Sequence, residues 1–377
     1  MSEHPPASRR ARRGFVALIA TLGLIAAACG DDSDDSPADA QTTAAPAAPA
    51  ATEPPAEPAA EPADEPEETT PAAAAPATTE APATDAGADR SDWPEKLVLA
   101  AVPAEQDAQL QESYSVTVEI LEDELGIPVE FFQAADYAGV IEALIADRVD
   151  LAQFGPFAYV IAIANGADAA PVGVMVGEKD EEPGYQSYLV ARSDNDDVNG
   201  LGDILGKRVC FVDPGSTSGF LVPTDGLLDA GIDPNDELTG IFAGGHDASV
   251  ISVANGDCDA GFAFDSMVTE LLPERGEIEE GEIKIVWESE IIAGSPMAMR
   301  NGLPESLKAE IANIFAERIN VDWAAENGYC ETNDPILCSF SDEAIWGYVY
   351  RDDSFYEGIR TLCRNLDVSQ APQCEGI

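Results

Sequence analysis

The chain has 377 residues, of which 45% are hydrophobic, and its formal net charge is −52. From Trp93 onward there are 14 Lys and Arg residues against 54 Asp and Glu, so nucleic acids and anionic membrane surfaces are poor partners. This balance is typical of a solvated acidic surface. It does not exclude a small anionic ligand, because oriented backbone amides act at contact distance, whereas salt screens the charges of more distant acidic side chains.

The N-terminal segment predicts export. In "RRARRGFVALIATLGLIAAAC", four arginines precede an apolar run that ends in small residues and Cys29. This pattern is that of a secretory signal rather than of a membrane-spanning helix. The stretch from Ala26 to Cys29 looks like a bacterial lipobox with Ala in place of the usual Leu. We therefore expect a signal peptide over residues 1–28 and a lipid on the Cys29 thiol.

Residues 29–92 predict a tether. Ala, Pro, Thr, Asp and Glu dominate this stretch, and no aromatic residue occurs in it before Trp93. Such a composition cannot bury enough apolar surface to fold. As a random coil it would span about 45 Å, and more with polyproline segments, so it would hold a folded body away from a membrane.

The remaining residues are enough for two lobes with separate cores. Apolar patterning predicts strands alternating with helices, which favours parallel sheets. The expected strands cover 97–102, 129–133, 149–154, 172–176, the stretch "YQSYLVAR" and 297–299, and the expected helices cover 111–125, 138–146 and 158–165. We expect lobe 1 over 93–192, lobe 2 over 193–291, a return to lobe 1 over 292–320 and a C-terminal extension over 321–377. The two crossings between lobes predict a hinge.

Three consecutive hydroxyl residues stand in "CFVDPGSTSGFLVPTDGLL". A short strand over 208–212 precedes them and a helix over 220–228 follows, so Ser216, Thr217 and Ser218 fall at a helix N-terminus. One of them is enough to cap the helix. Three hydroxyls beside free amides and the positive end of the helix dipole favour a site for an oxyanion.

The two predicted lobes repeat one pattern. "VIEALIADRVDLAQFGP" and "VISVANGDCDAGFAFDS" each give the end of a helix, a turn, an Asp and a strand ending at Phe. The repeat equates the helix start at Tyr137 with that at His246. Because ligands in such sheets bind beyond the carboxyl ends of the strands, we expect both side chains to point into one cleft.

Six cysteines follow Cys29, an even number that predicts disulfides in an exported chain. The preferred pairing is Cys210 with Cys258, Cys330 with Cys338 and Cys363 with Cys374. The four cysteines near the C-terminus also permit other connectivities. Zinc is less favoured, because there is no CxxC spacing and the folded part has a single histidine.

Five stretches in order carry a resemblance to a known family. "LAQFGPFAY", "GYQSYLV", "VDPGSTSGFLVP", "GGHDASVISVANGDCDAGFA" and "SEIIAGSPMAMRNGLP" together resemble the phosphonate, phosphite and phosphate binding proteins of ABC importers, the PhnD-like family. The resemblance covers about 97–319. It implies an α/β fold of the type II periplasmic-binding class with a discontinuous first lobe, to which this chain adds a cysteine-rich helical extension. It also implies closure of two lobes on a ligand, delivery to a membrane permease, and no enzymatic activity.

The resemblance further implies the site residues. The hydroxyls of Ser216–Ser218 and the imidazole of His246 would hold the phosphorus oxyanion, with Tyr137 and Tyr159 contributed by the first lobe. Asp265 would read the ligand's substituent, either an amine or a proton-bearing oxygen. Hydroxyl, phenol, imidazole and amide donors suit a group with acceptor oxygens only. A helix cap is the alternative role for Asp265.

Three other possibilities remain open at this stage. A hydrolase would need Gly-x-Ser-x-Gly, and here Thr217 occupies the central position. A binding protein for sulfate, molybdate, a pyrimidine or a dicarboxylate would share the fold class, as would a sensory module on a tether. For the favoured function we expect a monomer on the outer face of the cell membrane, ABC permease and ATPase subunits as partners, and neither a cofactor nor a metal.

Overall fold

The computed structural model describes residues 90–105 and 107–377. The predicted signal peptide, Cys29 and nearly all of the predicted tether lie outside the described residues. Within the described part, no helix has the length and the apolar character that crossing a membrane requires.

The first lobe is built on a six-stranded sheet with the order β13-β4-β12-β3-β1-β2. Strand β1 is parallel to its neighbours β2 and β3, and four of its five residues are buried, which is typical of a parallel strand covered on both faces. Strands β12 and β13 are antiparallel to their neighbours. The strands are β1 (Leu97–Ala101), β2 (Val129–Phe132), β3 (Leu151–Gln153), β4 (Ala169–Val176), β12 (Pro296–Arg300) and β13 (Gly347–Val349).

Helices from both ends of the described chain pack with this sheet. The predicted helix over 111–125 is divided at Tyr114 into two helices, and the fully buried Tyr114 ring packs beside Phe131. The helices of this lobe are α1 (Asp107–Ser113), α2 (Ser115–Leu125), α3 (Tyr137–Ile145), α4 (Pro156–Ala164), α9 (Glu305–Glu317) and α10 (Val321–Asn327).

The second lobe is built on a five-stranded sheet with the order β10-β6-β9-β7-β8. Strand β7 is parallel to β8 and β9, whereas β6 is antiparallel to β9 and β10. The strands are β6 (Ser187–Arg192), β7 (Arg208–Phe211), β8 (Thr239–Phe242), β9 (Ala260–Phe264) and β10 (Ile283–Glu288). The helices are α5 (Val222–Asp229), α6 (Pro234–Glu237), α7 (His246–Ala254) and α8 (Leu272–Arg275), with π-helical turns before α5 (Thr217–Leu221) and α8 (Met267–Leu271) and a 3₁₀ turn at Leu201–Ile204.

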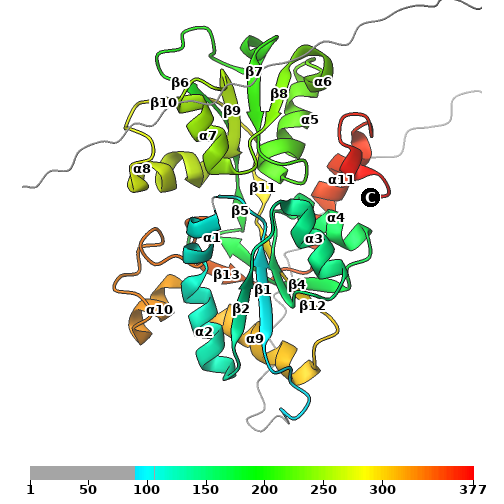
Figure 1. Cartoon of the computed structure of the whole chain (residues 1–377), viewed down its shortest axis with the longest axis vertical. Coiled ribbons are helices and arrows are strands. Elements are labelled where there is room, and N and C mark those ends of the chain that lie inside the picture. The colour runs from blue at the N-terminus through cyan, green and yellow to red at the C-terminus, as the bar shows by residue number, and fades with distance from the viewer. Residues whose placement is uncertain (1–89, 106) are drawn as a thin grey trace, which may run out of the picture. The chain divides into compact units, whose positions relative to one another are not determined.

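Two short strands connect the lobes. Strand β5 (Gly184–Tyr185) pairs antiparallel with β11 (Ile292–Ala293), and both lie between the two larger sheets (Figure 1). The chain thus leaves the first sheet after β4 and returns to it at β12. The sequence analysis placed "YQSYLVAR" at the end of lobe 1, but its pairing with β9 and β10 puts β6 in the second sheet.

The C-terminal extension is less helical than expected and contacts both lobes. Strand β13 adds an edge to the first sheet, and α11 (Glu357–Asn365) packs against α4 (Figure 1). The side chain of Asn235 in the second lobe donates to the Ser369 carbonyl at 2.9 Å. Two 3₁₀ turns, Asp353–Tyr356 and Pro372–Cys374, complete the extension. The structure has disulfides at Cys210–Cys258, Cys330–Cys338 and Cys363–Cys374, the preferred pairing.

Candidate ligand-binding site

The three hydroxyl residues lie where β7 gives way to the π-helical turn that leads into α5. Ser216 is the cap of this turn, and its Oγ accepts the Gly219 N–H at 3.0 Å. A side chain at Gly219 would come within 2.4 Å of Val212, so glycine lets the turn pack directly on the strand end. Ser216, Thr217 and Ser218 are each at most 2% exposed. Capping therefore accounts for one hydroxyl, and two more are buried beside it.

His246 is the first residue of α7 and faces Ser216. The Phe264 N–H donates to His246 Nδ1 at 3.1 Å, which leaves the ring proton on Nε2. Nε2 lies 3.4 Å from Ser216 Oγ and 3.5 Å from the Tyr137 hydroxyl. Burial lowers the pKa of His246 to about 3, so the ring is neutral at neutral pH. His246 therefore presents one N–H donor and no charge.

Tyr137 is the first residue of α3 and reaches the same place from the first lobe. Asp136 caps this helix by accepting the Gly139 N–H at 2.8 Å, which sets the position of the helix start. Burial raises the pKa of the Tyr137 phenol, with the nearby Asp213 carboxylate adding to the effect, so the phenol keeps its proton. The Tyr137 hydroxyl lies 3.5 Å from His246 Nε2, so the two helix starts that the sequence repeat equates bring their side chains to the same place.

These side chains line a small cavity of about 20 Å³ between the lobes. Val102, Ala104, Phe154 and Phe264 supply apolar walls. None of the described residues that line it is Lys or Arg. Among residues 90–105 and 107–377, no three His, Cys, Asp or Glu side chains are grouped so as to hold a metal ion. At the hydroxyl turn the cavity therefore offers neutral donors and oriented amides, which suits an oxyanion.

Contacts across the cleft hold the lobes together around this cavity. The Phe157 N–H at the start of α4 donates to Thr217 Oγ1 at 2.9 Å, and the His246 N–H donates to the Ala104 carbonyl at 2.7 Å. Arg275 Nη1 forms an ion pair with Glu105 Oε2 at 2.5 Å. Burial raises the pKa of Glu105 to about 7, against the lowering effect of Arg275. The described conformation is therefore a closed one.

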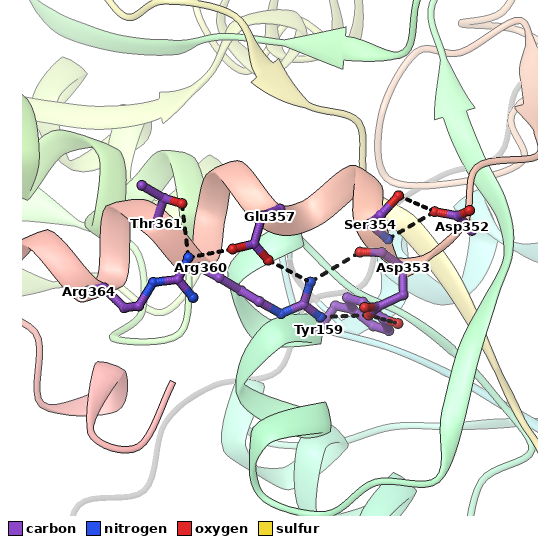
Figure 2. Close-up of polar contacts among 8 residues, drawn as sticks. All are labelled: Tyr159, Asp352, Asp353, Ser354, Glu357, Arg360, Thr361 and Arg364. Atoms are coloured by element: carbon purple, nitrogen blue, oxygen red, sulfur yellow. Dashed lines mark hydrogen bonds and ion pairs between the residues drawn. The ribbon is translucent and has the colours of Figure 1, made fainter. Parts of the chain in front are cut away.

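Tyr159 lies away from the cavity, unlike the arrangement implied by the resemblance. Its hydroxyl donates to Asp353 Oδ1 at 2.8 Å, and Arg360 Nη2 lies 2.6 Å from the same oxygen (Figure 2). Its ring packs on Tyr356, with ring centroids 5.0 Å apart. No motif in the C-terminal extension indicates that it would supply these partners. In this structure Tyr159 anchors the extension to α4.

Asp265 borders a neighbouring cavity instead. Its Oδ2 accepts the Gln186 N–H and its Oδ1 accepts the Ser266 N–H, both at 2.9 Å. This cavity, of about 250 Å³, shares Tyr185 and Glu343 with the smaller one. Burial raises the pKa of Asp265. Asp265 therefore lies next to the hydroxyl site but not in its wall.

The cavity has polar lining residues that the sequence analysis did not identify. Tyr185, on hinge strand β5, lines the cavity together with Thr217 and Ser218, and burial raises the pKa of its phenol. Asp342 and Glu343 reach the cavity from the extension. Tyr185 stands inside one of the quoted stretches, "GYQSYLV", whereas "SFSDEAIW" carries no recognisable motif.

Comparison with known proteins shows what this chain resembles in sequence and in fold. A family model described as the periplasmic phosphonate substrate-binding protein of ABC transporters matches residues 99–321. A phosphate-import protein of Mycolicibacterium smegmatis is 46% identical over 276 residues, covering 71% of this chain and 84% of that protein. A phosphonates-binding periplasmic protein of Escherichia coli is 31% identical over 212 residues, 55% of this chain and 61% of that protein. A phosphonate-transporter binding protein of Pseudomonas aeruginosa has the same fold, with a TM-score of 0.62, 23% identity and coverage of 74% and 92%.

Proposed function

Because the chain belongs to the phosphonate substrate-binding family of ABC transporters, and is therefore a transport component rather than an enzyme, we propose that it captures phosphate, phosphite or a phosphonate in the cavity beside the hydroxyl turn. The single observation that carries this proposal is the convergence of Ser216–Ser218, His246 and Tyr137 without a Lys or Arg. A phosphorus oxyanion has acceptor oxygens only, and these groups supply donors.

Among such ligands, a compact one fits the cavity best. A cavity of about 20 Å³ is little more than one water molecule needs, so the lobes must part to admit any phosphorus oxyanion, and a compact one requires the smallest opening. The most similar relative described above is named for phosphate import, which also favours an inorganic ligand. Tyr185 supplies a second phenol to the cavity, whereas Tyr159 does not line it. Asp265 would act on the ligand only through the neighbouring cavity.

Capture by hinge closure follows from where the donors come from. Tyr137 belongs to the first lobe and the hydroxyl turn and His246 to the second, so a ligand that bonds to both favours the closed arrangement. The contacts Phe157–Thr217 and Arg275–Glu105 exist only when the lobes meet, and they add to the stability of that state. Neutral donors hold an anion less tightly than full cations would, which permits release to a permease.

The cellular setting is part of the same proposal. Family membership places the protein outside the cytoplasm, where it serves an ABC permease and its ATPase. The arginine-rich apolar N-terminus and Cys29 support a signal peptide over 1–28 and a lipid anchor on the outer face of the cell membrane. The tether over 29–92 would let the folded part, acting as a monomer, reach both the medium and the permease.

Calorimetric titration tests the ligand class. Phosphate, phosphite, methylphosphonate, 2-aminoethylphosphonate, sulfate and molybdate would each be titrated into the full-length chain at neutral pH. We expect binding of at least one phosphorus compound, and weakened binding in His246→Ala, because losing a hydrogen bond to a charged group costs about 1.5–3 kcal/mol. Binding of sulfate or molybdate alone would refute the proposal.

A further inference from the structure

We propose that Asp342 and Glu343 select the fourth substituent of the bound phosphorus oxyanion, and that the cavity prefers orthophosphate, which bears a hydroxyl there, to methylphosphonate. This inference rests on the proposed function and narrows it. It concerns two carboxyl groups from the segment between Cys338 and β13, which lies beyond the residues that the family model matches. The extension would thus determine ligand specificity as well as cover the lobes.

Both carboxyl groups are held in place by the first lobe. The Tyr114 hydroxyl donates to Asp342 Oδ1, and the Ser295 hydroxyl donates to Glu343 Oε1 at 2.7 Å. The Glu343 N–H donates to Ser341 Oγ at 3.1 Å, which fixes the backbone beside them. Within the described part of the chain the Glu343 side chain is hydrogen-bonded through Oε1, and Glu343 lines both this cavity and the neighbouring one.

The cavity is therefore polar in two different ways. The hydroxyl turn, His246 and Tyr137 offer protons, whereas Asp342 and Glu343 offer carboxyl oxygens. Burial raises the pKa of both carboxyl groups, that of Glu343 to about 8 with help from the neighbouring Asp342, so the pair does not hold two full negative charges at neutral pH. The charge of Arg275 lowers the pKa of Asp342, but this guanidinium is already paired with Glu105.

The substituent opposite the pair needs a proton. A ligand oxygen without one would be repelled by the remaining negative charge. A methyl group would cover the carboxyl oxygens without giving them a hydrogen bond, which leaves a buried polar group unsatisfied. A P–OH group donates to the pair while the other three oxygens accept from the hydroxyl turn and its neighbours. An aminoalkyl arm also carries protons, but beside a cavity of about 20 Å³ it would require a wider opening than a hydroxyl does.

Titration of the full-length chain with phosphate, methylphosphonate, sulfate and 2-aminoethylphosphonate tests the inference. In the wild type we expect phosphate to bind about tenfold or more tightly than methylphosphonate, the equivalent of one lost buried hydrogen bond. Sulfate has the same shape but no proton at neutral pH, and should bind more weakly still. In Glu343→Leu we expect phosphate affinity to fall about tenfold and methylphosphonate affinity to change less than about threefold.

Glu331→Leu is the matched control, because Glu331 is an exposed carboxylate of the same extension. It should leave all affinities unchanged, and thermal unfolding of each variant shows whether it folds. Equal binding of phosphate and methylphosphonate by the wild type, a parallel loss of both in Glu343→Leu, or tightest binding of 2-aminoethylphosphonate would overturn the inference. Each of these results leaves the proposed function standing, whereas a wild type that binds no phosphorus compound refutes both.

Discussion

Replacing Thr217 with valine should separate the hydroxyl's role from the shape of its side chain. Thr217 is 1% exposed, and its Oγ1 accepts the Phe157 N–H across the cleft at 2.9 Å. Valine has nearly the same volume but removes this acceptor and the donor to the ligand. The bond between the lobes contributes about 0.5–1.5 kcal/mol and a bond to a charged ligand about 1.5–3 kcal/mol. Their sum, about 2–4.5 kcal/mol, corresponds to a rise in Kd of roughly 30- to 1,500-fold.

The assay is calorimetric titration with whichever phosphorus oxyanion binds the wild type most tightly. Thr224→Val is the matched control, because Thr224 is a buried threonine on α5 whose Oγ1 has no hydrogen-bond partner among the described residues. Losing that hydroxyl should leave both affinity and stability unchanged or slightly improved. If Thr217→Val binds within about threefold of the wild type, the hydroxyl contributes little to closure or to the ligand, and the reasoning fails.

Three further outcomes are expected. Burial lowers the pKa of His246 to about 3, so below pH 6.5 the unfolded chain binds a proton that the folded chain does not bind. Between pH 6.5 and about 3, the free energy of unfolding of the wild type relative to His246→Gln should therefore fall by about 1.4 kcal/mol for each pH unit that the pH is lowered. Urea titrations measure this difference, and a difference that stays constant with pH would contradict the prediction. Arg275→Met should weaken ligand binding about tenfold or more at pH 8 and less at pH 6. The reason is that the pKa of Glu105 is about 7, and a protonated carboxyl group needs no cationic partner. Equal effects at both pH values would argue against the ion pair as a closing contact. Replacing Cys210 and Cys258 with serine should lower the free energy of unfolding by about 2–5 kcal/mol, because the disulfide closes a loop with a sequence separation of 48. Chemical denaturation measures this loss, and a smaller loss would contradict the prediction.

Much of the lobe architecture could be predicted from the sequence because its signals are local. The strand at Leu97 and the helix starts at Tyr137 and His246 follow from apolar runs and from turn residues, and the structure places them as expected. The break at Tyr114 was missed, because the helical pattern continues through it and only the packing of the ring on Phe131 reveals it. The sheet to which β6 belongs was also misjudged, since strand pairing is a long-range property.

The site was predictable where one segment supplies several groups. Ser216–Ser218 and the glycines before His246 are visible in the sequence as runs, and the structure brings them together. Tyr159 could not be placed from its own surroundings, because the residues that engage it come from an extension about 190 positions later in the chain. The same is true of Asp342 and Glu343, whose neighbours Tyr114 and Ser295 are distant in sequence.

A crystal structure of the protein grown with phosphate would test the central claim most directly. Our account expects a tetrahedral ligand between the lobes, within hydrogen-bonding distance of the Ser216–Ser218 turn, of His246 Nε2 and of the Tyr137 hydroxyl. A closed protein with phosphate bound elsewhere, or with its hydroxyl turn bonded only to protein atoms while phosphate is bound, would contradict it.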